Sequence, residues 1–257
     1  MYIIGERING MFKDVAKAIR EKNKRIIQEL ALKQIEKGAD ALDVNLGTAV
    51  EDPLSAMEWL VKTIGEVTEI TLAIDTTKLA VMEKGLQCCK SKPIINSTSA
   101  DEEKLNTLIP LAKKYNAGLI GLTMSRKGIP SDANSRLELA IHILNRWQEE
   151  GLPVEDLYID AVILPVNVAQ AQCPEVLETI HQVKMLSQPP PKTILGLSNV
   201  SQGTKYRSLI NRTYLVMALA FGLEAAILDP FDEELRQAMR TAEVLLNKTV
   251  YCDSYLK

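Results

Sequence analysis

The chain has 257 residues, of which 46% are hydrophobic and 25% charged, and this length fits one large α/β domain or two small ones. Its formal net charge of −3 gives no basic field of the kind that binding to nucleic acid or to an anionic membrane requires, so we expect neither partner. Apolar runs stay shorter than the roughly 18 residues of a membrane span, and residues 1–10 meet a Glu and an Arg too early for a signal peptide, which predicts a cytoplasmic protein.

Eight short apolar runs recur along the chain and are rich in Ile, Leu and Val. Each has the length of a strand, and each is too continuously apolar for a strand with one exposed face. They are residues 2–6, 41–45, 71–75, 93–97, 118–123, 157–163, 193–199 and 225–229. This pattern indicates a parallel sheet that is buried on both faces.

Segments with helical periodicity separate these runs. Residues 23–38 end in Gly38 as a helix C-terminal stop, and residues 52–67 start with Asp52 as an N-cap and Pro53 in the first turn. The others are residues 78–89, 101–115, 135–151, 174–186, 209–222 and 232–247. We therefore expect eight strands and eight helices in strict alternation.

This alternation predicts an α/β protein with a (β/α)₈ TIM barrel as one domain over residues 1–257. The strand starts lie roughly 22 to 39 residues apart, as in a barrel of about 250 residues. A doubly wound open sheet is the alternative, but one that binds a dinucleotide would carry a G-x-G-x-x-G turn after its first strand, and none is present. The proline cluster at 187–192 is short enough to be a connection before the seventh strand.

The four cysteines show no C-x-x-C spacing. They are Cys88, Cys89, Cys173 and Cys252, and the first two are adjacent on an expected helix. This arrangement favours reduced thiols over a disulfide framework.

Polar side chains close each apolar run, at the carboxyl ends of the strands where barrels of this kind carry their chemistry. They are Glu6, Arg7, Asn9, Asp43, Asn45, Asp75, Asn96, Ser97, Thr123, Asp160, Ser198, Asn199 and Asp229. A single Asp or Asn in such a place can serve as a turn former or helix cap. A whole ring of carboxylates and amides would stay under-bonded without a ligand or ordered water, so it predicts a binding site.

The ligand should offer N–H donors to the carboxylates, and an edge with both a donor and an acceptor to the Asn side chains. A metal fits poorly because His142 and His181 both fall within helical segments and no H-E-x-x-H spacing occurs, so we expect no bound metal. Phosphate fits poorly because the mouth is acidic and no Walker-type loop occurs. A planar, amide-like heterocycle suits the ring best.

Seven segments carry a family resemblance. They are IIGERING at 3–10, ALDVN at 41–45, AIDTT at 73–77, INSTSA at 95–100, GLIGLTM at 118–124, LYIDAVILPVNVAQ at 157–170 and LGLSNVSQ at 195–202. Together they resemble the pterin-binding methyltransferases, most closely the methyltetrahydrofolate:corrinoid/iron-sulfur protein methyltransferases, over essentially the whole chain. The resemblance implies an enzyme that moves the N5-methyl group between 5-methyltetrahydrofolate and the cobalt of a corrinoid (cobalamin).

Two relatives of that family differ from this chain. Dihydropteroate synthase would carry an N-x-T-x-D-S-F loop after strand one and a basic Ser-x-Arg ending, whereas this chain has INGMFKD and LDPFDEE, so that enzyme remains a distant alternative. Methionine synthase resembles the chain in its folate barrel but adds its own corrinoid module, whose D-x-H-x-x-G signature is absent here. The resemblance therefore implies that a partner protein supplies the corrinoid.

The resemblance also assigns residues. It places the pterin over Asp75, Asn96 and Asp160, with Asn199 near N5 and Ser198 and Gln202 beside it. Arg207 would line the site, and Met124 and Ile227 would form apolar walls or simply belong to the core. The catalytic residues would be Asn199 and Asp160. Asn199 would donate a hydrogen bond to N5, and either Asp160 or an ordered water would relay the proton.

Several alternatives stay open. The partner can be the corrinoid/iron-sulfur protein or the small corrinoid protein of an O-demethylase or methylamine-type system, and a folate-binding protein without catalysis is a separate possibility. A homodimer is implied by the family and by the apolar helix at 214–222, which can equally pack on the barrel. An acidic rim would favour a partner with basic groups.

Overall fold

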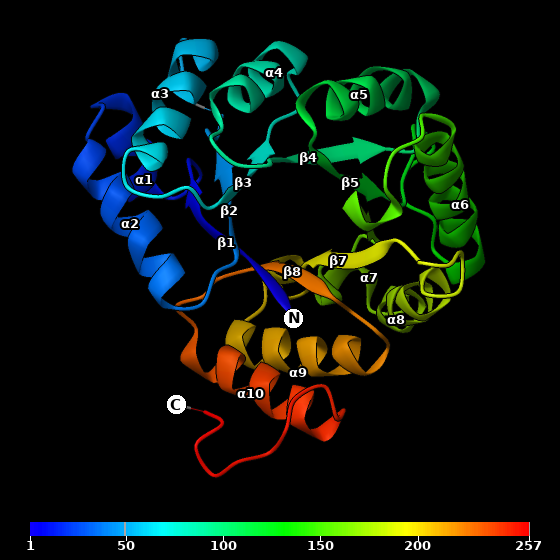
Figure 1. Cartoon of the computed structure of the whole chain (residues 1–257). Coiled ribbons are helices and arrows are strands. Elements are labelled where there is room, and N and C mark those ends of the chain that lie inside the picture. Colours follow the sequence, from blue (N-terminus) through cyan, green and yellow to red (C-terminus); the bar gives the residue numbers. More distant parts are fainter. Residues whose placement is uncertain (49, 257) are drawn as a thin grey trace.

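A computed structural model describes residues 1–48 and 50–256. Eight parallel strands close into a barrel in sequence order, and β1 pairs with both β2 and β8 (Figure 1). The strands are β1 Tyr2–Asn9, β2 Ala41–Asn45, β3 Thr71–Asp75, β4 Ile94–Ser99, β5 Gly118–Leu122, β6 Leu157–Asp160, β7 Lys192–Gly196 and β8 Ala225–Leu228. The predicted (β/α)₈ barrel is confirmed and the open sheet is excluded. The expected domain also takes in residues 49 and 257, which lie outside the described residues.

Helices surround the barrel on all sides (Figure 1). They are α1 Lys13–Arg20, α2 Lys24–Glu36, α3 Pro53–Gly65, α4 Leu79–Cys88, α5 Glu102–Tyr115, α6 Ala133–Glu149, α7 Val166–Ala169, α8 Gln172–Val183, α9 Arg207–Ala220 and α10 Glu233–Leu245, with short 3₁₀ helices η1 Val154–Asp156 and η2 Leu197–Ser201. The predicted cap of α3 is confirmed, because the Asp52 carboxylate accepts a hydrogen bond from the Ser55 N–H at 3.2 Å and Pro53 opens the helix. Gly38, at φ +93°, ends the α2 segment as predicted.

Strict alternation is wrong at two places. Two helices, α1 and α2, join β1 to β2, and the short α7 precedes α8. The signal for α1 is weak because this helix of eight residues buries only Val15, Ala18 and Ile19. The seventh apolar run is also not all strand: β7 stops at Gly196, and η2 buries Leu197 and Val200 at a spacing of three residues, which prolongs the apolar pattern beyond the strand.

The interior of the barrel holds one layer of apolar side chains. Its members are Ile4, Ala41, Ala73, Ile94, Ile120, Tyr158, Ile194 and Ala225. Alternate residues of a strand face the same side, so the next inward positions toward the carboxyl ends are Glu6, Asp43, Asp75, Asn96, Leu122, Asp160, Gly196 and Ile227. The apolar layer is thus followed, two residues further toward the carboxyl ends of the strands, by a layer that we call the polar floor because Glu6, Asp43, Asp75, Asn96 and Asp160 lie in it.

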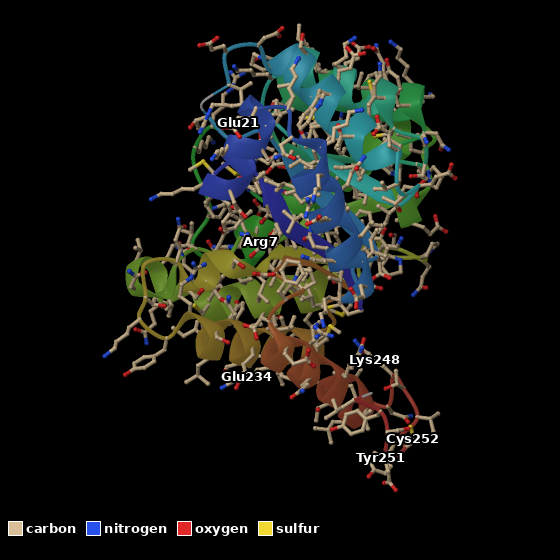
Figure 2. All side chains as sticks on the ribbon, turned by 90° about the vertical axis from the view of Figure 1, so that its left-hand side faces the viewer. Arg7, Glu21, Glu234, Lys248, Tyr251 and Cys252 are labelled. Carbon is tan, nitrogen blue, oxygen red and sulfur yellow. The ribbon has the colours of Figure 1, made fainter. Side chains whose placement is uncertain are left out.

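The chain beyond α10 folds back along that helix. The Tyr255 hydroxyl lies 3.0 Å from the Thr241 hydroxyl, and Arg240 Nη1 donates to the Leu256 carbonyl at 2.9 Å. Figure 2 shows Tyr251 and Cys252 at the end of the molecule, well away from Arg7 on the barrel. Cys88, Cys89, Cys173 and Cys252 are free thiols. No helix in the described part of the chain is long and apolar enough to cross a membrane.

Candidate active site

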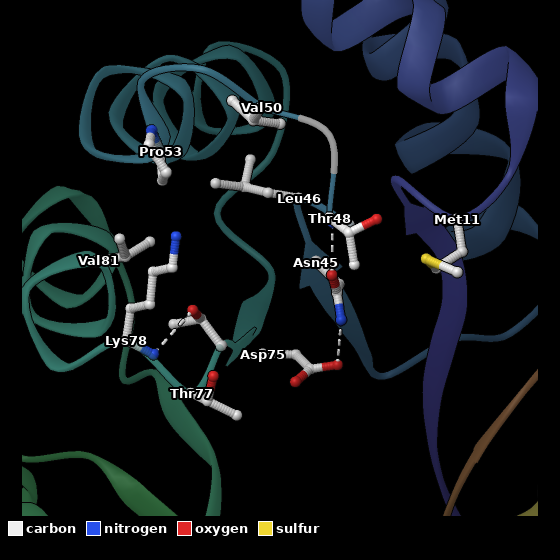
Figure 3. Close-up of a pocket in the computed structure, with 12 residues that line it drawn as sticks. Met11, Asn45, Leu46, Thr48, Val50, Pro53, Asp75, Thr77, Lys78 and Val81 are labelled. Carbon is white, nitrogen blue, oxygen red and sulfur yellow. Dashed lines mark hydrogen bonds between the residues drawn. The ribbon is translucent and has the colours of Figure 1, made fainter.

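Asp75 and Asn45 meet at the carboxyl ends of β3 and β2. Asn45 Nδ2 donates to Asp75 Oδ2 at 2.6 Å, and both side chains line a cavity of about 370 Å³ (Figure 3). Burial raises the pKa of Asp75 above its usual value, and the Asn45 bond partly opposes that rise. Lys78, Thr48 and Met11 line the same cavity (Figure 3). This pocket therefore opens directly from the polar floor.

Asn96 and Asp43 form a second pair across the mouth. Asn96 Nδ2 donates to Asp43 Oδ1 at 2.9 Å, although their strands, β4 and β2, are not neighbours in the barrel. Burial raises the pKa of Asp43 well above its usual value, and the nearby Asp75 and Glu6 carboxylates add to the rise. The floor thus concentrates acidic groups that are poorly solvated.

Asp160 closes β6 and is almost fully buried, with 7% of its surface exposed. Its two oxygens accept the Val162 N–H at 2.7 Å and the Gly196 N–H at 3.3 Å. Burial nevertheless dominates and raises the pKa of Asp160 to about 6. A carboxyl with that pKa exchanges its proton within the physiological range.

Ser198 and Arg207 border the mouth from the segment after β7. The Ser198 hydroxyl donates to Glu6 Oε1 at 2.8 Å. Burial raises the pKa of Glu6, and the Ser198 bond partly opposes it. Arg207 Nε donates to the Ser201 hydroxyl at 3.2 Å and its Nη2 to the Ser198 carbonyl at 3.3 Å, so its guanidinium braces η2.

Asn199 and Gln202 are exposed at this end of the barrel. Asn199 lies on η2 beside Gly196, and a Cβ added to that glycine would come within 3.0 Å of Asn199 Nδ2. Because Gly196 also donates its N–H to Asp160, the Asn199 amide and the Asp160 carboxyl flank the same residue. The two predicted catalytic groups are therefore brought together.

Ile227 and Met124 occupy different positions. Ile227 packs against the interior apolar layer, and Met124 is partly buried just beyond β5. The Met124 carbonyl accepts the Ala100 N–H at 2.9 Å, which ties the end of β5 to the end of β4.

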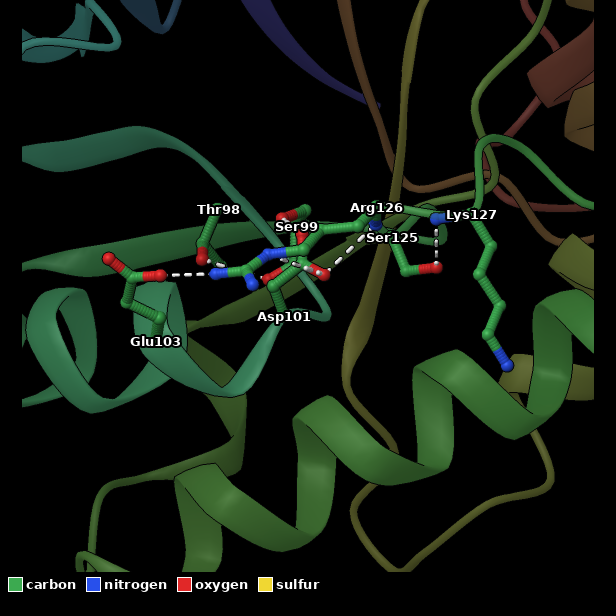
Figure 4. A network of polar contacts seen from close by, with 7 residues as sticks. All are labelled: Thr98, Ser99, Asp101, Glu103, Ser125, Arg126 and Lys127. Atoms are coloured by element: carbon green, nitrogen blue, oxygen red, sulfur yellow. Dashed lines mark hydrogen bonds and ion pairs between the residues drawn. The ribbon is translucent and has the colours of Figure 1, made fainter.

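A network of polar contacts fixes the loop after Met124 (Figure 4). The Asp101 carboxylate accepts the Arg126 N–H at 2.9 Å and the Ser99 hydroxyl at 2.7 Å, and these bonds lower the pKa of Asp101. The Arg126 guanidinium pairs with Glu103 on α5. The network thus holds one side of the mouth in place.

Three members of the predicted ring have local roles instead. Arg7 stacks on the Phe12 ring at 3.9 Å and pairs with Asp14 at 3.3 Å. Asn9 and Asp229 accept the N–H groups two residues further along, at 2.9 and 3.0 Å, as turn formers do.

The expectation that the ring would remain under-bonded is only partly right, because Asn45, Asn96, Ser198 and backbone N–H groups satisfy much of it. The expected acidic rim is also corrected. The buried acids lie on the floor, whereas the exposed loop ends carry both signs, with Lys78, Lys127 and Lys205 alongside Asp52 and Asp132.

His142 and His181 lie on the outer helices α6 and α8, as predicted. His142 Nε2 lies 3.1 Å from Glu102 Oε1 on α5. Within residues 1–48 and 50–256, no group of three or more His, Cys, Asp or Glu side chains is arranged to hold a metal ion.

The profile of the family described as "Pterin binding enzyme" matches residues 9–229, which is most of the chain. The chain belongs to the pterin binding enzyme family. This family placement agrees with the resemblance found in the sequence and with a floor of carboxylates and amides suited to a planar heterocycle.

Two curated relatives share this barrel in sequence. One, a methylcorrinoid:tetrahydrofolate methyltransferase from Eubacterium limosum, is 28% identical over 259 residues, covering 100% of this chain and 95% of that protein. The other is methionine synthase from Mycobacterium tuberculosis, 25% identical over 240 residues that cover 88% of this chain and 20% of that protein. The chain thus corresponds to nearly all of the first relative and to about a fifth of the second.

Two solved structures share the fold. The dihydropteroate synthase of Yersinia pestis, with a pterine-sulfa conjugate, superposes with a TM-score of 0.72 at 15% identity, covering 96% of this chain and 94% of that one. The dihydropteroate synthase from Clostridium difficile, in the presence of pteroic acid, gives 0.73 at 18% identity, covering 95% and 96%. At these identities the likeness concerns the fold alone.

Two residues of β2, Asp43 and Asn45, belong to the ring predicted from sequence but were not assigned to the ligand site. Their signal is the alternation along β2, where residues 41, 43 and 45 share one face. Glu6 was missed in the same way. Its contact with Ser198 joins residues 192 positions apart, which a local pattern does not reveal.

Proposed function

We propose that this chain is a methyltransferase that moves the N5-methyl group between 5-methyltetrahydrofolate and the cobalt of a corrinoid carried by a separate protein. The observation that carries the proposal is the full-length likeness to the Eubacterium limosum methylcorrinoid:tetrahydrofolate methyltransferase. Family membership and a polar floor with Asp75, Asn96 and Asp160 support folate as the substrate. Dihydropteroate synthases share the fold at 15% and 18% identity only.

The pterin ring is matched by the chemistry of the floor. Its 2-amino group and N3–H form parallel donors that a carboxylate can accept in fork fashion, which suits Asp75 and leaves Asp160 for the N5 side of the ring. Asn96 serves the remaining mixed edge with its carboxamide. Ser198 on η2, Gln202 directly after it and Arg207 at the start of α9 would border the pterin, and Met124 and Ile227 would supply apolar contact.

Cleavage at N5 needs a donor. When the bond between N5 and its methyl carbon breaks, the electron pair stays on N5, which must then gain a hydrogen bond and finally a proton. The corrinoid supplies the cobalt nucleophile that takes the methyl carbon. Asn199 would donate to N5 most strongly as its basicity grows, and Asp160 would provide the proton directly or through water. With a pKa of about 6, Asp160 is protonated in about a tenth of the molecules at pH 7.

The corrinoid would arrive on a partner. The chain spans only about a fifth of methionine synthase, and it lacks the D-x-H-x-x-G signature expected of a corrinoid module. The partner would be the corrinoid/iron-sulfur protein of acetogenesis or a small corrinoid protein of an O-demethylase or methylamine-type system. The name of the Eubacterium limosum relative puts the methylcorrinoid first, which supports transfer toward tetrahydrofolate as the direction of the reaction.

Three further properties belong to the proposal. The chain would act as one pterin-binding domain over residues 1–257, in the cytoplasm, and as a homodimer. An apolar groove of about 280 Å³ along α8 and α9 supports the dimer, with Leu209, Met217 and Tyr214 among its lining residues.

Stopped-flow absorbance tests the reaction. The protein is mixed with 5-methyltetrahydrofolate and free cob(I)alamin, and in the reverse assay with tetrahydrofolate and methylcobalamin. The proposal is supported if the Co(I) absorbance disappears only when both the protein and 5-methyltetrahydrofolate are present. Tight folate binding without this loss identifies a folate-binding protein without catalysis. Product formed from p-aminobenzoate and the pterin pyrophosphate identifies a dihydropteroate synthase.

Binding and partner choice are tested separately. Asp75→Ala and Asp160→Ala should each weaken binding of 5-methyltetrahydrofolate in calorimetry, and unchanged affinity in both variants would remove these residues from the site. Rates with a purified corrinoid/iron-sulfur protein and with a small demethylase corrinoid protein distinguish the two partner classes.

A further inference from the structure

The Asp75 and Asn96 side chains, on β3 and β4, are each held by a side chain of β2. Asn45 Nδ2 donates to Asp75 Oδ2 at 2.6 Å, and Asp43 Oδ1 accepts from Asn96 Nδ2 at 2.9 Å. Positions 43 and 45 share one face of the strand, so a single strand supports both of these side chains.

These bonds fix which atoms are offered to the ligand. The Asn45 amide cannot turn round without loss, because its Oδ1 accepts the Gly47 N–H at 2.7 Å and its Nδ2 is thereby left for Asp75. Asp43 uses the donor end of the Asn96 carboxamide, so Asn96 Oδ1 remains available as an acceptor. This orientation survives protonation of Asp43, since a neutral carboxyl keeps a carbonyl oxygen that accepts.

Asp43 is costly as a purely structural group. Only 3% of its surface is exposed, and among the described residues no Lys or Arg lies within ion-pair distance of its carboxylate, while Asp75 and Glu6 lie near enough to repel it. A buried acid with acidic neighbours and a single side-chain bond destabilises the fold. What it contributes is the orientation of Asn96.

We propose that Asp43 and Asn45 are positioning residues of the folate site: Asp43 holds Asn96 with its carboxamide oxygen toward the ligand, and Asn45 holds the Asp75 carboxylate in place. This inference rests on the proposed function, in which Asp75 and Asn96 contact the pterin. Asp43 then determines affinity through Asn96 without touching the folate.

A double-mutant cycle tests this role. The dissociation constant of 5-methyltetrahydrofolate is measured by calorimetry for the wild type, Asp43→Ala, Asn96→Ala and the double variant, and thermal unfolding is followed for each. Asp43→Ala should weaken binding about tenfold, as expected for the loss of one buried hydrogen bond. In the Asn96→Ala background the same change should have less than about a twofold effect, because its target is gone.

Matched variants separate positioning from general damage. Asp43→Ala in an Asp160→Ala background should keep its tenfold effect, since Asp160 lies on β6 across the mouth. Asp43→Asn, which keeps an acceptor of the same size, should bind more tightly than Asp43→Ala. Asp43→Ala should also unfold at a temperature no lower than the wild type, because it removes a poorly compensated buried acid.

The outcomes distinguish the two proposals. In one outcome the wild type binds folate, Asn96→Ala weakens the binding and Asp43→Ala leaves it unchanged. That result overturns the positioning role and leaves the proposed function standing. The positioning role is likewise overturned, and the function again left standing, if Asp43→Ala weakens binding equally with and without Asn96. A wild-type protein that does not bind 5-methyltetrahydrofolate overturns the proposed function, and the positioning role with it.

Discussion

Replacement of Asp160 by Asn should change how the stability of the fold depends on pH. Asp160 is buried, accepts two backbone N–H groups and has no cation within ion-pair distance among the described residues. Asn at this position keeps the size and one acceptor oxygen but cannot ionise. The variant therefore isolates the cost of the Asp160 charge.

The magnitude follows from the pKa. Burial raises the pKa of Asp160 from its ordinary 3.8 to about 6, a difference of about 2 units at about 1.4 kcal/mol each. Because the folded state binds this proton more tightly than the unfolded state, stability falls as the pH rises between about 4 and about 6. Ionisation of Asp160 should thus cost about 3 kcal/mol at pH 7, fully developed above the folded-state pKa.

Urea unfolding of both proteins from pH 4 to pH 8 measures this cost. Glu6, Asp43 and Asp75 also have raised pKa values, so the informative quantity is the difference in unfolding free energy between wild type and variant at each pH. That difference should shift by about 2.4 kcal/mol in favour of Asp160→Asn between pH 4 and pH 7, because at pH 4 the unfolded chain has already lost part of this proton. A difference that stays constant across this range would refute the claim that burial dominates the environment of Asp160.

Three more changes have defined expectations. Asn199→Ala should leave unfolding in urea unchanged, because the side chain is exposed, and should slow methyl transfer about a hundredfold or more in single-turnover stopped flow; full wild-type turnover would exclude the donor role. Gly196→Ala would bring a Cβ within 3.0 Å of the Asn199 amide, and it should slow methyl transfer while folate still binds. Gly65→Ala is the matched control and should leave the rate unchanged, because its Cβ meets nothing closer than 3.6 Å. Arg136→Leu should lower the unfolding free energy by about 3 kcal/mol or more, because the buried guanidinium donates to the carbonyls of residues 130, 161 and 162; a smaller loss in urea unfolding would contradict this bracing of the segment after β6.

The fold was predictable because burial on both faces leaves a strong pattern in the sequence. Every strand of a closed parallel barrel is covered inside and outside, so its apolar run is continuous and ends in polar residues at the mouth. The pattern fails where another element buries apolar groups over a short distance. α1 offers three buried residues in eight, and Leu197 belongs to a 3₁₀ turn whose spacing imitates the end of a strand.

The sequence predicted which side chains lie at the mouth of the barrel better than it predicted the contacts between them. Alternation along each strand identifies Asp75, Asn96 and Asp160 as inward residues. It does not reveal that Asn96 reaches Asp43 two strands away, because that contact depends on the diameter and stagger of the closed barrel. Nor does it separate these residues from Asp229, whose carboxylate accepts a turn N–H and also helps to raise the pKa of Glu6.

The two supports on β2 also make ligand affinity a probe of chain assembly. β2 reaches its place only when it pairs with both β1 and β3, and a slip of one residue would turn positions 43 and 45 away from the interior together. During refolding, folate binding should therefore appear in a single step, when this strand reaches its correct register. Chains in which the strand is out of register should not bind folate.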